Sequence, residues 1–254
     1  MIIIDATKPF FRIKMKLIAV AIFFISFLLL LIPTSKTLAE VFVHDIIAVK
    51  NEETFLKVET RGKFSRKGGE LVEFFVDNKS IGKALSGGDG FAFKQVSTSK
   101  TGTFKITVKS ASSESSGLLL IFKKGTNIVF TDIEGGLLEG EFLKQKPRDR
   151  SQQAIRQISK KYPVVILQAG IISKKAAKDW IKRHGFIELP VIAWNNGELF
   201  QELIKKGLKI KAVIGGDAII DSAAQYKPLL FSFRGKESAL NVKSWDEIEK
   251  RLSK

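Results

Sequence analysis

Four carboxylates in the second half of the chain follow short apolar runs, and together they could carry out phosphoryl chemistry. Asp132 ends the run "NIVFTD", and Glu134 follows two residues later. Asp217 ends "KAVIGGD", and Asp221 lies four residues further on. Oxygen-only ligands suit Mg²⁺, which takes a few carboxylates with water and phosphate oxygens. A carboxylate can also attack phosphorus while a second acid moves the protons.

The composition excludes several other kinds of site. The 254 residues contain no cysteine, so disulfides, thiolate nucleophiles and zinc–sulfur centres are excluded. The two histidines, His44 and His184, stand singly, which argues against a histidine base or a histidine-rich metal site. The 42 Lys and Arg against 26 Asp and Glu give a formal charge of +16, which favours anionic partners. No basic–aromatic stripe indicates a nucleic-acid surface, so no nucleic-acid partner is expected.

The first 39 residues have the pattern of an export signal. Lys14 and Lys16 precede a near-apolar run of 16 residues, Leu17 to Ile32, and Thr37-Leu38-Ala39 provides the small-x-small pattern of a cleavage site. Such a run is shorter than the roughly 20 residues that cross a bilayer comfortably. Residues 1–39 are therefore predicted to be a signal peptide, with an uncleaved N-terminal membrane anchor as the alternative. Everything after residue 40 is expected in the periplasm or cell envelope.

Residues 40–123 read as an all-β sandwich of about seven antiparallel strands. Alternating or clustered apolar residues in "TFLKVETRG", "LVEFFVDNKSIG", "GFAFKQVS", "GTFKITVKS" and "GLLLIFKK" are separated by glycine-rich turns. The stretch from "VEFFVDNKSIG" to "GTFKITVKS" resembles the bacterial immunoglobulin (Ig)-like modules of exported proteins. That resemblance implies a spacer or binding platform. The serine-rich "SASSESSG" could be a linker, but the boundary is expected at Lys123 to Thr126.

Residues 127–254 read as an α/β three-layer, Rossmann-like domain with a parallel sheet. Five apolar runs alternate with helical patterns, which is typical of βαβ units. The helices are expected near 149–161, 173–184, 197–206, 218–226 and 244–253, with Ser173 and Ser244 as N-caps. Ligands of such sheets bind beyond the carboxyl ends of the strands, where Asp132 and Asp217 would lie.

"FTDIEGGLL" and "GGDAIID" resemble the first and fourth motifs of the haloacid dehalogenase (HAD) superfamily of phosphatases. The resemblance spans residues 127–254. It implies that Asp132 is the nucleophile and a Mg²⁺ ligand and that Glu134 is the general acid/base and a member of the same metal set. Asp217 would ligate the metal and Asp221 would support it.

The remaining motifs depart from the pattern of that superfamily. Glu134 stands where the superfamily has Asp, and its extra methylene shifts the carboxylate. "VVILQAG" offers Gln168 where Ser or Thr should grip the phosphoryl group. No lysine falls at the position of the third motif, so Lys205 or Lys206 is the candidate replacement.

The absence of a cap insertion implies an open site for a large or lipid-like phosphate ester. The pairing of a sandwich with a capless domain is loosely similar to the phosphatidate phosphatase arrangement. "KKAAKDWIKRHGF" is a basic helix whose Trp180, Ile181 and Phe186 are expected in the core, with an anionic membrane surface as the alternative reading.

Three functions stay open from the sequence. The first is an exported, Mg²⁺-dependent phosphomonoesterase acting through an aspartyl-phosphate on Asp132. The second is a catalytically degenerate HAD-like domain that binds a metal, an anion or an envelope partner, and it is motivated by Gln168 and the missing lysine. The third is a purely structural envelope protein.

Overall fold

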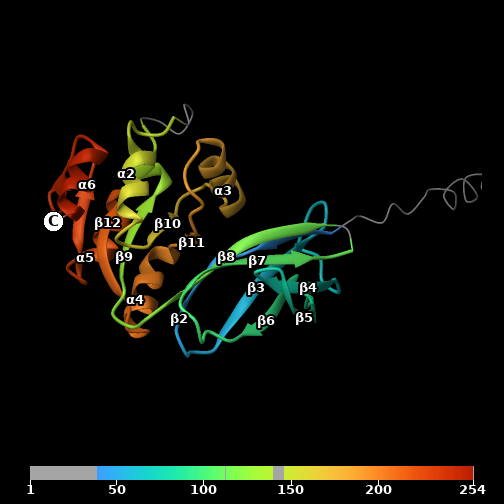
Figure 1. Ribbon diagram of the computed structural model, residues 1–254. Helices are drawn as coiled ribbons and strands as arrows, with labels where there is room; N and C mark the ends of the chain where they lie inside the picture. The colour runs from blue at the N-terminus through green and yellow to red at the C-terminus, as the bar shows by residue number, and fades with distance from the viewer. Residues whose placement is uncertain (1–38, 112, 140–145, 254) are drawn as a thin grey trace, which may run out of the picture. The chain divides into compact units, whose positions relative to one another are not determined.

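A computed structural model describes residues 39–111, 113–139 and 146–253, and residues 38–254 form one compact unit. The expected signal peptide or anchor, residues 1–39, lies outside the described residues except for Ala39. In the part of the chain that the structure describes, no helix is long and apolar enough to cross a membrane. Among these residues the strands form three sheets, two in the first half and one in the second, and the second half also holds five α-helices (Figure 1).

The first half is a β-sandwich of two sheets. Sheet A is antiparallel, in the order β1-β3-β6, and sheet B has the order β2-β8-β7-β4-β5. The strands are β1 (Glu40–Val43), β2 (Ile46–Val49), β3 (Thr54–Arg61), β4 (Leu71–Val76), β5 (Lys79–Leu85), β6 (Phe91–Val96), β7 (Gly102–Lys109) and β8 (Glu114–Phe122). The sequence predicted about seven antiparallel strands, whereas eight are present and β2 pairs with β8 in parallel.

Alternation along the strands builds the sandwich core. Leu56 and Val58 of β3 face Val72 and Phe74 of β4 in one cluster, and none of the four is exposed to solvent. Residues between them point outward, as the two-residue period of a strand requires. The core therefore follows directly from the sequence pattern.

Strand β8 is buried on both of its faces. Leu119 and Ile121 belong to the sandwich core, whereas Leu118, Leu120 and Phe122 belong to a second cluster that includes residues of the C-terminal half. This double burial explains why "LLLIF" is apolar without alternation. The serine-rich segment "SASSESSG" (110–117) is not a linker, because β8 begins within it, at Glu114.

Sheet C of the second half is entirely parallel, in the order β11-β10-β9-β12-β13-β14. Its strands are β9 (Asn127–Asp132), β10 (Val164–Gln168), β11 (Val191–Ala193), β12 (Lys209–Ile214), β13 (Leu229–Ser232) and β14 (Leu240–Asn241). The sequence predicted five strands. The sixth, β14, has two residues and is too short to give an apolar pattern.

Helices cover both faces of sheet C. They are α2 (Ser151–Ile158), α3 (Lys174–Arg183), α4 (Glu198–Lys205), α5 (Asp217–Ala224) and α6 (Trp245–Ser253). Residues of α2, α3 and α6 share a core with one face of the sheet, and residues of α4 and α5 share a core with the other. All five helices lie where the apolar period predicted them. Ser173 caps α3 by accepting a hydrogen bond from the backbone N–H of Ala176, as expected.

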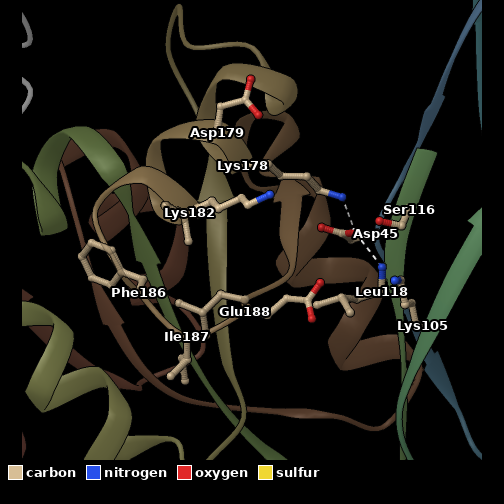
Figure 2. A pocket seen from close by; sticks show the side chains of 13 residues that line it. Asp45, Lys105, Ser116, Leu118, Lys178, Asp179, Lys182, Phe186, Ile187 and Glu188 are labelled. Carbon is tan, nitrogen blue, oxygen red and sulfur yellow. Dashed lines mark hydrogen bonds and ion pairs between the residues drawn. The ribbon is translucent and has the colours of Figure 1, made fainter. Parts of the chain in front are cut away.

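The buried carboxylate of Asp45, between β1 and β2, connects three elements. It accepts hydrogen bonds from the backbone N–H groups of Leu118 (2.8 Å) and Val191 (2.7 Å) and from the ammonium of Lys178 (2.6 Å). Figure 2 shows Lys178 of α3 reaching to Asp45. Since the Asp45 side chain is fully buried, the three donors replace its hydration.

Replacing Asp45 with Ala is expected to lower the free energy of unfolding by about 3 kcal/mol, because the buried ion pair loses one partner and two backbone donors lose their acceptor. Chemical denaturation of residues 38–254 measures this loss. Asp179→Ala is the matched control, since Asp179 is an exposed acid on α3, the helix that carries Lys178. Equal stability of the two variants would contradict the role given to Asp45.

Candidate functional site

The candidate site lies at the carboxyl edge of sheet C, around the end of its central strand β9. The chain runs from β9 to β10 and β11 on one side, and then returns to β12, β13 and β14 on the other. Ligands of open parallel sheets bind beyond the strand ends at such a reversal. Asp132 is the last residue of β9, so it lies at this point.

The carboxylate of Asp132 closes the turn that follows it. A single π-helical turn, η1 (Ile133–Leu137), begins directly after β9, and Asp132 is its N-cap. Oδ1 accepts hydrogen bonds from the backbone N–H groups of Gly135 (3.1 Å) and Gly136 (2.8 Å), and Oδ2 also accepts from Gly135 (3.1 Å). Asp132 therefore points into its own turn.

Glycine is required at two positions of this turn because of close backbone approach. A Cβ atom on Gly135 would lie 2.1 Å from the backbone nitrogen of Gly216, and one on Gly136 would lie 2.1 Å from Oγ1 of Thr131. The turn thus packs against the loop that follows β12. This explains why "EGG" and "GG" follow the two predicted strands.

The environment of Asp132 raises the pKa of its carboxyl group. Burial raises the pKa of this carboxyl from 3.8 to about 6, and the charge of Glu134 acts in the same direction. The N–H groups of Gly135, Gly136 and Gly216 lower the pKa but do not offset the burial. A buried carboxyl with a raised pKa at a sheet reversal is a candidate functional group.

Glu134 lies in the turn with its side chain toward the end of β10. A Cβ atom on Gly170 would lie 2.7 Å from one oxygen of the Glu134 carboxylate and 2.8 Å from the other. Among the residues that the structure describes, the buried Oε1 atom of Glu134 has no hydrogen-bond partner. Glu134 is therefore a second buried acceptor close to Asp132.

Gln168 ends β10 beside the site, but its amide is engaged. Its Nε2 donates to the backbone oxygen of Ile172 (2.8 Å), so the side chain closes the loop between β10 and α3. In the sheet, Leu167 rather than Gln168 is paired with Asp132. The bond to Ile172 uses one of the two N–H groups of the Gln168 amide.

The other two predicted acids lie on the surface of α5. Asp217 is exposed at the first position of the helix, and Asp221 is exposed one turn later. Asp221 forms an ion pair of 2.9 Å with Lys236. Its hydrogen bond raises the pKa of Lys236, and the charge of Asp217 also raises it. These two acids are thus partnered by a lysine.

Lys205 and Lys206 lie at the opposite edge of the sheet, so the prediction that they grip a phosphoryl group is not supported. They end α4, just before β12 begins at Lys209, and Lys206 pairs with Glu202. The next residue, Gly207, accepts a hydrogen bond from Gly125, just before β9 begins. A helix that returns the chain to a parallel strand must end at the amino edge of the sheet.

Two arginines that the sequence did not single out lie near Asp132. The guanidinium of Arg148 stacks 4.1 Å from the ring centre of Phe233, and its backbone N–H donates to Leu137 of the turn. Arg234 follows β13 and donates to the backbone oxygen of Glu134 (3.4 Å). Arg234 could have been found, because residues directly after parallel strands share one edge. Arg148 lies in a loop, where no strand end indicates its position.

The charges of the two arginines oppose one another. Burial lowers the pKa of Arg148, and the charge of Arg234 lowers it further, while the carboxylates of Glu139 and Asp132 raise it. In the described part of the chain, the buried Nε of Arg148 has no hydrogen-bond partner. This corner therefore holds two guanidinium groups that repel one another, beside the carboxylates of Asp132 and Glu139, and a buried donor that a bound anion could pair.

The predicted Mg²⁺ set does not fit this arrangement. Within residues 39–111, 113–139 and 146–253, no group of three or more His, Asp or Glu side chains is placed to hold a metal. Asp132 accepts from its own turn, Asp221 is paired with Lys236, and two guanidinium groups lie close by. A divalent cation would meet repulsion from those guanidinium groups.

Helix α3 does not offer an apolar face to a membrane. Trp180 and Ile181 are each 4% exposed, and Phe186, just after the helix, is 8% exposed in the same core. These three side chains lie in the core, as expected, so the apolar side of α3 packs inside the domain. The exposed residues of the helix are polar or small, and they include Lys175, Asp179 and Lys182.

A cavity of about 450 Å³ lies between α3 and β8, away from Asp132 (Figure 2). The ion pair of Asp45 and Lys178 forms part of its wall, and Lys105, Lys182 and Glu188 also line it. Figure 2 shows the carboxylate of Asp179 turned away from the Asp45–Lys178 pair. The cavity is therefore a feature of the Asp45 contact and not of the sheet edge.

No protein-family model matches the sequence, and the comparison with curated proteins gives no match. Solved structures that resemble the chain include an "IG27 protein domain", with 12% identity over 34% of this chain and 99% of that one, at a TM-score of 0.29. A putative membrane anchored protein from Corynebacterium diphtheriae has 12% identity over 35% of this chain and 22% of its own, at a TM-score of 0.30. The fibronectin(III)-like modules of Clostridium thermocellum CbhA have 16% identity over 33% of this chain and 97% of theirs, at 0.25.

These similar structures are Ig-like and fibronectin-like β-sandwich domains, and each match covers about a third of the chain. The strand pairing of the first half makes it a β-sandwich.

The raised pKa of Asp132 predicts a specific pH dependence of stability. Between pH 3.8, the ordinary value, and about 6, the folded chain holds this proton more tightly than the unfolded chain. Stability from this group is therefore present below the lower value and is lost as the pH rises through the upper one. Relative to Asp132→Asn, wild type should lose up to about 3 kcal/mol over this window.

Thermal unfolding of both proteins at a series of pH values measures the difference. Asp217→Asn is the control, because that exposed acid should leave the profile of wild type unchanged. Parallel profiles for wild type and Asp132→Asn would show that Asp132 titrates normally.

Proposed function

We propose that residues 127–254 are a HAD-like domain that binds a phosphate ester or a similar anion at the carboxyl edge of sheet C without hydrolysing it. In this proposal the protein is exported and acts as a binding protein of the periplasm or cell envelope. The location rests on the signal pattern of residues 1–39. The HAD-like assignment is supported by the parallel sheet whose first strand ends at Asp132 and by Asp217 after β12.

The observation that carries the proposal is the pair of guanidinium groups beside the Asp132 turn. Arg148 is partly desolvated, is repelled by Arg234 and has a buried Nε without a partner among the described residues. A phosphoryl group brings negative charge and several acceptors, and arginine binds such groups with two parallel hydrogen bonds. An anion in this corner therefore relieves the repulsion and pairs the free donor.

The contacts of Asp132 and Gln168 argue against turnover. A nucleophilic carboxylate needs a lone pair directed at phosphorus, and three hydrogen bonds from Gly135 and Gly136 already occupy most of the lone pairs of Asp132. The amide of Gln168 is bound to Ile172. The carboxylate that should attack the phosphoryl group and the amide that should hold it are thus both used in hydrogen bonds within the protein.

A second candidate is a Mg²⁺-dependent phosphomonoesterase with Asp132 as nucleophile and Glu134 as general acid/base. It is favoured by one observation. Asp132 is buried at the sheet reversal with a pKa of about 6, and Glu134 beside it presents a buried oxygen without a partner among the described residues. Release of inorganic phosphate that requires Asp132 would decide for this candidate.

Titration of residues 38–254 with inorganic phosphate and with methylphosphonate, followed by calorimetry, tests the binding proposal. Arg148→Gln and Arg234→Gln should each weaken binding about tenfold, since a hydrogen bond to a charged group contributes about 1.5 kcal/mol. Arg156→Gln is the matched control, because Arg156 is exposed on α2. No binding by wild type, or equal binding by all variants, would overturn the proposal.

A further inference from the structure

The outer face of sheet A is rich in exposed phenylalanine. Residues of β3 and β6 alternate, so Leu56, Val58 and Ala92 enter the sandwich core while Phe55 and Phe93 point outward. Phe55 is 52% exposed and Phe93 is 51% exposed. Phe64, in the turn after β3, is 91% exposed. The sandwich thus keeps three large apolar side chains in water.

The ring of Phe93 begins a row of neighbouring aromatic rings that ends at Phe42, whose side chain is buried. The ring of Phe91 lies 6.3 Å from that of Phe93 and 6.3 Å from that of His44, which lies 5.2 Å from that of Phe42. The cross-strand register places Phe42 and Phe91 on either side of Glu59. The aromatic side chains therefore extend across all three strands of the sheet.

Cations lie over and around these rings. The ammonium of Lys57 is 4.1 Å from the ring centre of Phe91, and the guanidinium of Arg66 is 4.6 Å from the same ring. Lys63 lies 5.3 Å from the ring of Phe64. Neither Lys57 nor Lys63 has a carboxylate within ion-pair distance in the described ranges. Lys174 of α3 extends the positive charge along the edge of β1, where it contacts His44 (3.1 Å).

We propose that this face, defined by Phe55, Phe64, Phe91, Phe93, Lys57, Lys63 and Arg66, docks on an anionic lipid surface. Phe64 would enter the boundary between head groups and acyl chains, and the adjacent cations would contact lipid phosphates. Exposed aromatic residues flanked by lysine and arginine are the combination that binds peripheral proteins to anionic bilayers. The proposal does not depend on anion binding at Arg148.

The chemistry of the face favours lipid over other anionic partners. Phe64 stands in a tight turn, closed by a hydrogen bond from Gly62 to Ser65, and lies directly between Lys63 and Ser65 in sequence. An apolar group at the tip of a turn gains free energy by entering a hydrocarbon layer. A phenylalanine offers no hydrogen-bonding group for the hydroxyls of a sugar. The arrangement therefore suits a bilayer better than an acidic glycan.

Co-sedimentation with lipid vesicles tests the proposal. Residues 38–254 form one compact unit, so this segment can be used without the leader. It should bind vesicles of equal parts phosphatidylglycerol and phosphatidylcholine and leave pure phosphatidylcholine vesicles unbound. Phe64→Ser should weaken binding about tenfold and Lys63→Gln about fivefold, from the burial of one aromatic side chain and the attraction of one cation.

Leu85→Ser is the matched control, because Leu85 is 64% exposed on β5 of sheet B and should not contact the lipid. All three side chains are exposed or at a turn, so the variants are expected to fold. Equal binding to neutral vesicles, or an unchanged affinity in Phe64→Ser, would overturn the proposal. Binding to the acidic polysaccharide polygalacturonate in place of vesicles would also overturn it and assign the face to a glycan.

Discussion

The hydrogen bonds from Gly135 and Gly136 to the carboxylate of Asp132 determine how the candidate site is built. They hold the π turn after β9, and that turn leaves no room for a side chain against the loop after β12. Without the carboxylate, the buried N–H groups of the turn would have no acceptor. The carboxylate is also buried, and burial raises its pKa more than these hydrogen bonds lower it. The turn thus fixes the backbone of the site and encloses its central acid.

The surrounding charges follow from where the strands end. Arg234 comes directly after β13, and Arg148 reaches the same corner through its contacts with Leu137 and Phe233. Their positive charge takes the place that the sequence assigned to a metal and a lysine. In the function proposed above, a bound phosphoryl group would offset the repulsion between these two guanidinium groups and pair the Nε of Arg148.

The sandwich contributes to stability through a shared core. Leu118, Leu120 and Phe122 of β8 pack in one cluster with residues of β9, α4 and α5. Asp45 adds a buried polar contact between the strands of the sandwich and α3. The Ig-like half is therefore not a detached spacer in the compact unit of residues 38–254.

Elements with strong periodicity could be predicted from the sequence, whereas contacts between distant residues could not. The five helices, the cap at Ser173 and the end of β9 at Asp132 follow from local patterns. Strand β14 was missed because two residues give no period.

The site was only partly predictable. Strand ends placed Asp132 and Asp217 at one edge, but nothing local showed that Asp132 would bond to its own turn or that Asp221 would pair with Lys236. Lys205 and Lys206 lie at the amino edge of the sheet because α4 returns the chain to the start of β12, which no local motif shows.

The central claim is that the Asp132 corner binds a phosphoryl group and leaves it intact. A ³¹P NMR spectrum of p-nitrophenyl phosphate mixed with residues 38–254 and Mg²⁺ reports binding and turnover in one sample. The account predicts that the ester resonance shifts or broadens with wild type but not with Arg148→Gln, and that no inorganic phosphate resonance grows. Growth of that resonance with wild type, and its loss in Asp132→Asn, would contradict the account and show a phosphatase.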